Sequence, residues 1–168
     1  MKRFFSAIAL LLLFANVCLA DSFFAASNIK GFHRYENNRF AFSIDFPQRF
    51  SKILLLPENG DGIKVGTEDG RACITASGGY NVFASTDYYK EQYQSERERL
   101  GSKIAYSTLG DNYYAISWSE GATIYYCKQF FNNDYQNNFV IYYHRSQHDF
   151  YDDVVTQIEQ SFVPGWVK

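Results

Sequence analysis

The clearest pattern in the chain is a two-residue alternation of apolar and polar side chains, which is typical of β-strands with one buried face. It first appears over Arg39–Pro47, where Phe40, Phe42, Ile44 and Phe46 alternate with Ala41, Ser43 and Asp45. The pattern predicts a strand that ends at the proline, with its polar positions facing outward. The preceding residues, 21–34, carry no sustained period, and we expect a loose lead-in there.

Further strands are predicted along most of the chain. Turn residues flank Ile63–Thr67 and precede Arg71–Ser77, which predicts a β-hairpin after a connecting segment at Ile53–Leu56. A later region alternates in the same way and is interrupted only by short polar or glycine-containing turns. We expect four more strands in that region, at Ile104–Leu109, Tyr113–Glu120, Thr123–Phe131 and Asn138–His144. The connections are too short for parallel crossovers, so this region is predicted to be an antiparallel meander.

Two segments have helical character. Residues 85–100 are rich in charged and amide side chains and stop at Gly101, which is typical of a surface helix. A second helix is predicted from about Ser146 until Pro164 prevents its continuation. Its apolar stripe consists of Tyr151, Val155, Ile158 and Phe162. The order of elements predicts an α+β fold, in which an antiparallel sheet of about six or seven strands is flanked by two helices.

The first twenty residues have a different composition. Lys2 and Arg3 precede a short apolar run, and small residues lie near Ala20. This arrangement is typical of a signal peptide, so we expect residues 1–20 to be removed on export. Residues 21–168 are then long enough for a single α+β domain, with its core at about 35–163. We expect a periplasmic or secreted protein with no transmembrane segment in the mature chain.

Charge and cysteine content narrow the class of partner. Without its leader the chain has 14 basic and 18 acidic residues, a net charge of −4, and no basic block. This balance argues against nucleic acid as the partner. Cys73 and Cys127 remain, and an even number of cysteines in an exported chain predicts a disulfide between them.

Several of these segments together resemble a known group of proteins. The segment 39–47, the turns at Asn59–Gly62 and Asp69–Gly70, and the helix over Tyr151–Phe162 are similar to a group of small exported bacterial proteins of unknown function. That group in turn resembles the PsbP-like fold of extrinsic photosystem proteins, a nuclear Ran-binding protein and several bacterial envelope proteins. The resemblance covers roughly residues 35–163. It implies an antiparallel sheet flanked by helices and a role in binding or assembly, and no cofactor ligand carries over to this chain.

Two polar clusters are candidate sites for metal or acid–base chemistry. Residues Asn59–Gly62 with Glu68 partly match a calcium loop, but Pro57 stands where the first ligand would be, and we expect a β-turn instead. His144, His148 and Asp149 form the densest set of ionisable groups. Carboxylates are also favoured in the first turn of a helix without any catalytic role. We therefore expect no metal, cofactor or catalytic residue, and keep a small metal-dependent hydrolase around His144 and His148 as one alternative.

The remaining signal is an excess of aromatic residues, which make up 19% of the chain and include 14 tyrosines. Tyrosine doublets place one ring on each face of a strand. We expect Tyr113, Tyr125 and Tyr142 to form an outward binding surface, unless the helices cover that face. The leading hypothesis is an exported, non-catalytic module that binds a protein partner in the cell envelope or extracellular space. A glycan-binding module that uses the same exposed tyrosines is the second hypothesis.

Overall fold

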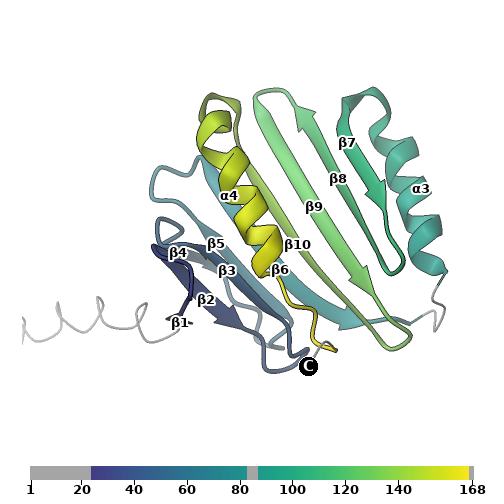
Figure 1. Cartoon of the computed structure of the whole chain (residues 1–168), viewed down its shortest axis with the longest axis horizontal. Helices are drawn as coiled ribbons and strands as arrows, with labels where there is room; N and C mark the ends of the chain where they lie inside the picture. Colours follow the sequence, from purple (N-terminus) through teal and green to yellow (C-terminus); the bar gives the residue numbers. More distant parts are fainter. Residues whose placement is uncertain (1–23, 83–86, 167–168) are drawn as a thin grey trace, which may run out of the picture.

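The computed structural model describes residues 24–82 and 87–166, and its largest element is a seven-stranded antiparallel sheet (Figure 1). The strand order across this sheet is β4-β5-β6-β10-β9-β8-β7. The strands are β4 (Lys52–Leu55), β5 (Gly62–Gly66), β6 (Ala72–Tyr80), β7 (Ile104–Leu109), β8 (Tyr113–Glu120), β9 (Thr123–Phe131) and β10 (Tyr135–His144). The expected signal peptide, residues 1–20, lies outside the described residues.

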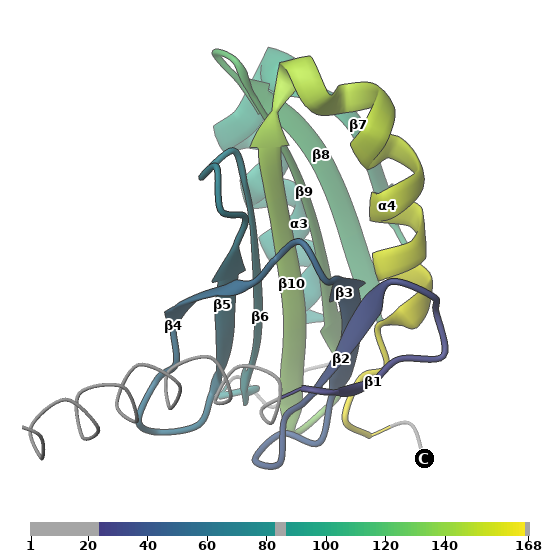
Figure 2. The same cartoon turned by 90° about the vertical axis from the view of Figure 1, so that its left-hand side faces the viewer.

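Two helices pack against opposite faces of this sheet (Figures 1 and 2). Helix α4 (His148–Ser161), which follows the short turn η2 (Arg145–Gln147), lies over the middle of one face. Helix α3 (Tyr88–Leu100), followed by η1 (Gly101–Lys103), lies over the β7–β8 end of the other face. We call these faces the α4 side and the α3 side. The predicted α+β fold with two helices and a largely antiparallel sheet is thus confirmed.

The residues of β8 alternate between two separate cores. Tyr114 and Ile116 pack with Tyr89 and Tyr93 of α3, whereas Ala115 belongs to the larger core beneath α4. That larger core is built from aromatic and branched side chains of both sheets and of α4. Its fully buried members include Phe42, Ile44, Phe46, Phe50, Val65, Ile74, Phe139, Ile141, Tyr151 and Ile158. None of the helices among the described residues is long and apolar enough to cross a membrane.

A second, three-stranded sheet joins α4 in covering the α4 side. It consists of β1 (Ala25–Ala26), β2 (Phe32–Glu36) and β3 (Ser43–Pro47), in that order. The loose lead-in expected over residues 21–34 is therefore wrong, because it contains β1 and the start of β2. The strand predicted over Arg39–Pro47 begins only at Ser43, because Ala41 has a φ of 55° and interrupts extended backbone.

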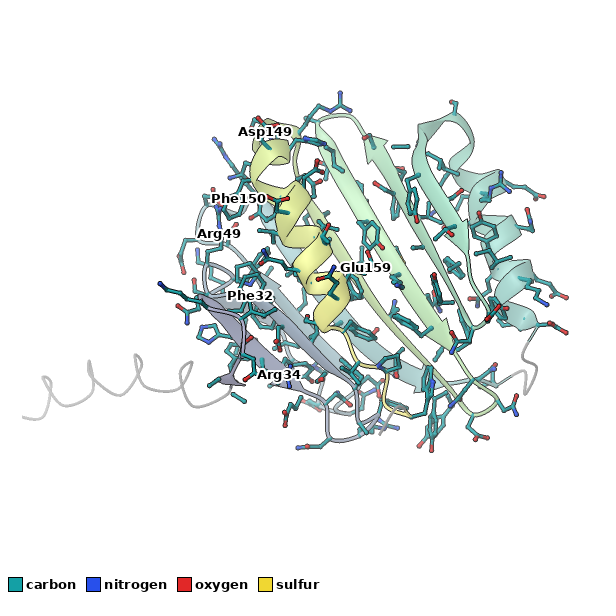
Figure 3. The ribbon with its side chains drawn as sticks, in the orientation of Figure 1. Phe32, Arg34, Arg49, Asp149, Phe150 and Glu159 are labelled. Atoms are coloured by element: carbon teal, nitrogen blue, oxygen red, sulfur yellow. The ribbon has the colours of Figure 1, made fainter. Side chains whose placement is uncertain are left out.

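An ion pair fixes this small sheet. Asp45 is only 1% exposed, although the alternation predicts it on the outer face. Its carboxylate accepts hydrogen bonds from Nε of Arg34 at 2.7 Å and from the Ser27 hydroxyl at 2.7 Å. The hydroxyl of Ser161, at the end of α4, accepts the backbone N–H of Asp45 at 2.9 Å. The buried charge is paired and hydrogen-bonded, as a buried carboxylate must be. Figure 3 shows Arg34 on the small sheet and Glu159 on α4.

The apolar stripe of α4 includes Tyr151, which is fully buried. The Tyr151 ring stacks on the ring of Tyr143, with 4.7 Å between the ring centroids. The helix buries Val154 more deeply than the expected Val155, which packs at the edge of the core. The hydroxyl of Tyr151 makes no hydrogen bond. Its burial raises the pKa of Tyr151 to about 12. A buried hydroxyl without a partner destabilises the fold by about 1–3 kcal/mol.

We predict that Tyr151→Phe increases the free energy of unfolding by about 1 kcal/mol, because it removes this unpaired hydroxyl and keeps the ring. The phenol of Tyr151 ionises at a lower pH in the unfolded chain than in the folded protein, so this group does not change the free energy of unfolding below pH 10 and lowers it as the pH rises toward 12. The variant should therefore lose less stability than the original chain over this interval. Urea unfolding at pH 8 and at higher pH, followed by circular dichroism, measures both effects.

The matched control is Tyr35→Phe. The Tyr35 hydroxyl accepts a hydrogen bond from Nδ2 of Asn37 at 3.0 Å, so its removal should decrease the free energy of unfolding by about 1 kcal/mol. Equal destabilisation by both substitutions would contradict the assignment of Tyr151 as an unpaired group.

Candidate functional site

The α3 side of the large sheet is covered only in part, and its side chains form bands across the strands. In the first band, Trp118 of β8 lies opposite Tyr125 of β9, Tyr125 opposite Tyr142 of β10, and Tyr142 opposite Cys73 of β6. The three aromatic residues are half-buried, whereas Cys73 is 2% exposed. Three neighbouring strands thus present an unbroken aromatic row, which we call the aromatic ladder (Trp118, Tyr125 and Tyr142).

The rings of the aromatic ladder pack against one another. The ring centroids of Trp118 and Tyr125 are 4.9 Å apart with planes at 7°, and those of Tyr125 and Tyr142 are 5.7 Å apart at 44°. A separation of 4.9 Å is too short for two parallel rings lying side by side in one plane, so Trp118 and Tyr125 are stacked. The ammonium of Lys64 lies 5.9 Å from the Tyr142 ring centroid. Neighbouring rings and the Lys64 ammonium therefore cover much of the flat faces of the aromatic ladder. A ligand could contact mainly the ring edges and hydroxyl groups.

Two further bands lie beside the aromatic ladder. The next is mainly aliphatic, with Ile116, Cys127, Val140 and Thr75 opposite one another on β8, β9, β10 and β6. The one after it is polar and contains Tyr114, Gln129, Asn138 and Ser77 in the same strand order. The Tyr114 hydroxyl donates to Oε1 of Gln129 at 2.9 Å, and Nε2 of Gln129 donates to Oε1 of Gln136 at 3.1 Å. The face therefore changes from aromatic through aliphatic to amide along the strands.

Helix α3 borders two adjoining open cavities on this face. The larger, about 420 Å³, lies between the amide band and the first turns of α3, with Tyr88, Glu91, Gln92 and Glu96 in its wall. The smaller, about 230 Å³, lies over the aliphatic band beneath Leu100. Glu96, Tyr114 and Gln129 line both cavities. We refer to the two together as the α3 groove.

The structure corrects the expected disulfide. Cys73 and Cys127 are both free thiols, on β6 and β9. Both face the α3 side, but β10 lies between their strands. Two strand spacings alone separate the Cα atoms by roughly 9–10 Å, and Cys127 is also offset from Cys73 by two residues along the strands. The separation is therefore well beyond the ~7 Å that a disulfide can span. Burial raises the pKa of Cys127 to about 12 and also raises the pKa of Cys73.

The three tyrosines expected on one surface are divided between the two faces. Tyr125 and Tyr142 lie together on the α3 side. Tyr113 lies opposite Phe130 on the α4 side, where its ring stacks under the ammonium of Lys128 at 4.3 Å. The expectation is wrong for Tyr113 because β8 buries Tyr114 against α3, whereas β9 buries Tyr126 against α4. The inward positions of these two adjacent strands therefore point to opposite faces.

Trp118, and not Tyr113, is the β8 residue of the aromatic ladder. The sequence pattern did not indicate it as a site residue. The sequence places it in one alternating set with Tyr114 and Ile116, which are buried, so alternation does not distinguish Trp118 from a core residue. Strand pairing would have found it, because Trp118 is directly opposite Tyr125 when the turn at Gly121 closes the hairpin. The groove residues Glu96 and Gln129 had no signal in the sequence.

The cluster of His144, His148 and Asp149 does not have the geometry of a metal-binding site. Nδ1 of His144 lies 2.7 Å from the Ser146 hydroxyl, and the two ring nitrogens of His148 are each 3.5 Å from an oxygen of Asp149 or Asp152. Within residues 24–82 and 87–166, no group of three or more His, Cys, Asp and Glu side chains could hold a metal ion. The metal-dependent hydrolase hypothesis therefore gains no support from this geometry.

The turn that partly matches a calcium loop is held by an arginine. The guanidinium of Arg39 donates to the carboxylate of Asp61 at 2.8 Å and to the carbonyl of Asn59 at 2.6 Å. Glu68 lies beyond the far end of β5, where it pairs with Lys52 at 2.8 Å. The oxygens that a calcium ion would need are therefore dispersed or already paired with cations.

Comparison with known proteins identifies the fold. No family model matches the chain, and no curated protein matches it. The solution structure of the cyanobacterial PsbP protein, CyanoP, from Synechocystis is similar, with a TM-score of 0.55 and 8% sequence identity. The match covers 83% of this chain and 97% of CyanoP. The chain therefore has a PsbP-like fold, as the sequence resemblance implied, and an identity this low shows the fold alone.

We predict that Cys73 and Cys127 are both alkylated when the purified protein is unfolded without reductant in N-ethylmaleimide, because both thiols are free. Peptide mapping by mass spectrometry measures the modification at each position. A sample reduced before alkylation provides the control and should give the same two modified peptides. A peptide pair that joins Cys73 to Cys127 would overturn the separation described above.

Proposed function

We propose that this chain is an exported, non-catalytic module that binds a protein partner in the cell envelope or extracellular space through the α3 side of its sheet. The aromatic ladder carries the proposal. Trp and Tyr are enriched in protein interfaces, where they supply rigid contact area at a small cost in conformational entropy. Here three such rings form a continuous row that neither helix covers completely.

The stacking of the aromatic ladder favours a protein over a glycan. A sugar ring binds best against the flat face of an exposed aromatic ring. Trp118 and Tyr125 stack on each other, and Lys64 lies over Tyr142, so few ring faces are available. The edges, the hydroxyl groups and the adjoining aliphatic band suit the mixed apolar and polar surface of a protein.

The chemistry of the face also favours binding over catalysis. The two thiols on it are the strongest candidate nucleophiles, and only the thiolate form reacts rapidly. Burial raises the pKa of both thiols, so both are neutral near pH 7. Export is proposed from residues 1–20, whose charged start and apolar run are typical of a signal peptide.

Site-specific photo-cross-linking tests the surface. We predict that a benzoyl-phenylalanine at position 125 or 142 forms covalent adducts with one defined protein in cells that produce this chain. Tyr125→Ala combined with a probe at position 142 should reduce the adduct at least fivefold, because it removes the central ring of the aromatic ladder. Adducts are identified by mass spectrometry after denaturing purification.

The control probe replaces Tyr106, which is 51% exposed and lies on the α4 side of β7. It should not yield the same adduct. Adducts from position 106 alone would contradict the proposed face. Loss of adducts after glycosidase treatment of the cells would instead favour the glycan hypothesis.

A further inference from the structure

One end of the α3 groove is acidic. Glu91 and Glu96 line the larger cavity, and none of the other residues that line it is basic. Nearby cations are engaged elsewhere: Lys90 pairs with Asp87 at 2.6 Å, and the guanidinium of Arg97 lies over the Tyr93 ring at 5.4 Å. Arg99 forms an ion pair with Glu96, in which two guanidinium nitrogens donate to Oε2, so Oε1 of Glu96 keeps acceptor capacity. Counted with Arg99, the carboxylates of Glu91 and Glu96 leave one excess negative charge at this end, which is complementary to one cation.

The same end contains an acceptor with no donor. Oε1 of Gln92 is buried and makes no hydrogen bond. Gln92 lies one helical turn from Glu96 and borders the larger cavity with it. The rings of Tyr88 and Tyr114 also line this cavity, so a flexible apolar stem could lie against them. A guanidinium has five N–H donors and a planar surface, which suits dispersed acceptors between aromatic rings better than a compact ammonium does.

The other end of the α3 groove is apolar and small. Leu100, Ile116, Trp118 and Val140 line the cavity of about 230 Å³. Sites for drug-sized ligands usually occupy about 300–1,000 Å³, so this cavity suits one side chain rather than a whole small molecule. Because it shares Glu96, Tyr114 and Gln129 with the charged end, the two cavities can receive neighbouring residues of one segment.

We propose that the α3 groove binds a segment of the protein partner in which an arginine occupies the carboxylate end and a neighbouring leucine or similar aliphatic residue fills the apolar end. This inference rests on the proposed function and specifies the chemistry of the partner. Gln129 lines both cavities and is hydrogen-bonded to Gln136 in the wall of the larger one, so these two amides can donate to and accept from the backbone of the segment.

Peptide titrations followed by NMR test this inference. The probes are Ac-Ser-Arg-Leu-Ser-NH2 and Ac-Ser-Leu-Arg-Ser-NH2, because the direction of the segment is not fixed by the cavities. At least one should give saturable shifts in the amide signals of Gln92, Glu96 and Cys127. Replacing Arg with Glu, or Leu with Ser, in the better peptide should weaken binding at least tenfold. A Lys peptide should bind more weakly than the Arg peptide.

Substitutions in the groove provide the second arm. Glu91→Gln with Glu96→Gln should weaken the better peptide at least fivefold, because it removes both carboxylates, replaces them with side chains of nearly the same size, and releases Arg99 from its ion pair with Glu96. Glu98→Gln is the matched control, because Glu98 is exposed on α3 and does not line either cavity. It should leave peptide binding unchanged.

The outcomes separate this inference from the proposed function. Peptides that give no saturable shifts, or shift residues on the α4 side only, overturn the groove inference. So does equal weakening by Glu98→Gln and by the double variant. If cross-linking from position 142 persists in such a case, the proposed function stands and only the groove inference fails. If position 142 gives no adduct while the Arg-Leu peptide binds as expected, the role of the aromatic ladder fails instead.

Discussion

The pairing of β6 with β10 in the middle of the large sheet determines which side chains reach each face. Nine consecutive residues, Ala72–Tyr80, pair with Tyr135–Tyr143 in reverse order without a register shift. This register directs Phe139, Ile141 and Tyr143 into the core beneath α4 and leaves Tyr142 on the α3 side. A shift of one residue would exchange the two sets, because side chains alternate along a strand. The two layers on the α4 side and the candidate site on the α3 side both depend on this pairing.

Most of the fold could be predicted from local patterns, because the alternating strands of the meander are joined by short turns whose residues favour reversal. In the small sheet only β3 could be predicted in the same way, and β1, β2 and the pairing of the three strands could not. β2 contains Arg34 in its middle, and Asp45 occupies a position that alternation assigns to solvent. Each charge is tolerated because the other pairs with it across the two strands. That compensation is visible only when the strands are placed side by side.

The candidate site was harder to predict than the fold, for a related reason. Alternation shows that a strand has two faces but does not show which layer buries each face. On β8 the more buried residues face α3, whereas on the neighbouring strand β9 they face α4. The residues that alternation assigns to the outside therefore lie on different faces in the two strands. For this reason Tyr113 and Tyr125 are on opposite sides of the sheet. The expected disulfide failed similarly, because the number of residues between Cys73 and Cys127 carries no information about the strand that lies between them.

The dimensions of the layers explain why the α3 side keeps an unfilled surface. Seven strands at about 4.8 Å spacing give a sheet roughly 29 Å wide, whereas one helix with its side chains is about 10–12 Å across. On the α4 side the three-stranded sheet extends the cover that α4 begins. On the α3 side no second layer joins α3 among the described residues, and α3 contributes only Tyr89, Tyr93 and Leu100 as buried residues. The remaining rings reduce their exposure by stacking on each other, but they still present apolar area. Removing this apolar area from water is favourable by about 25 cal/mol per square ångström before the costs of association are subtracted, and this is the physical basis on which we propose the face as a binding surface.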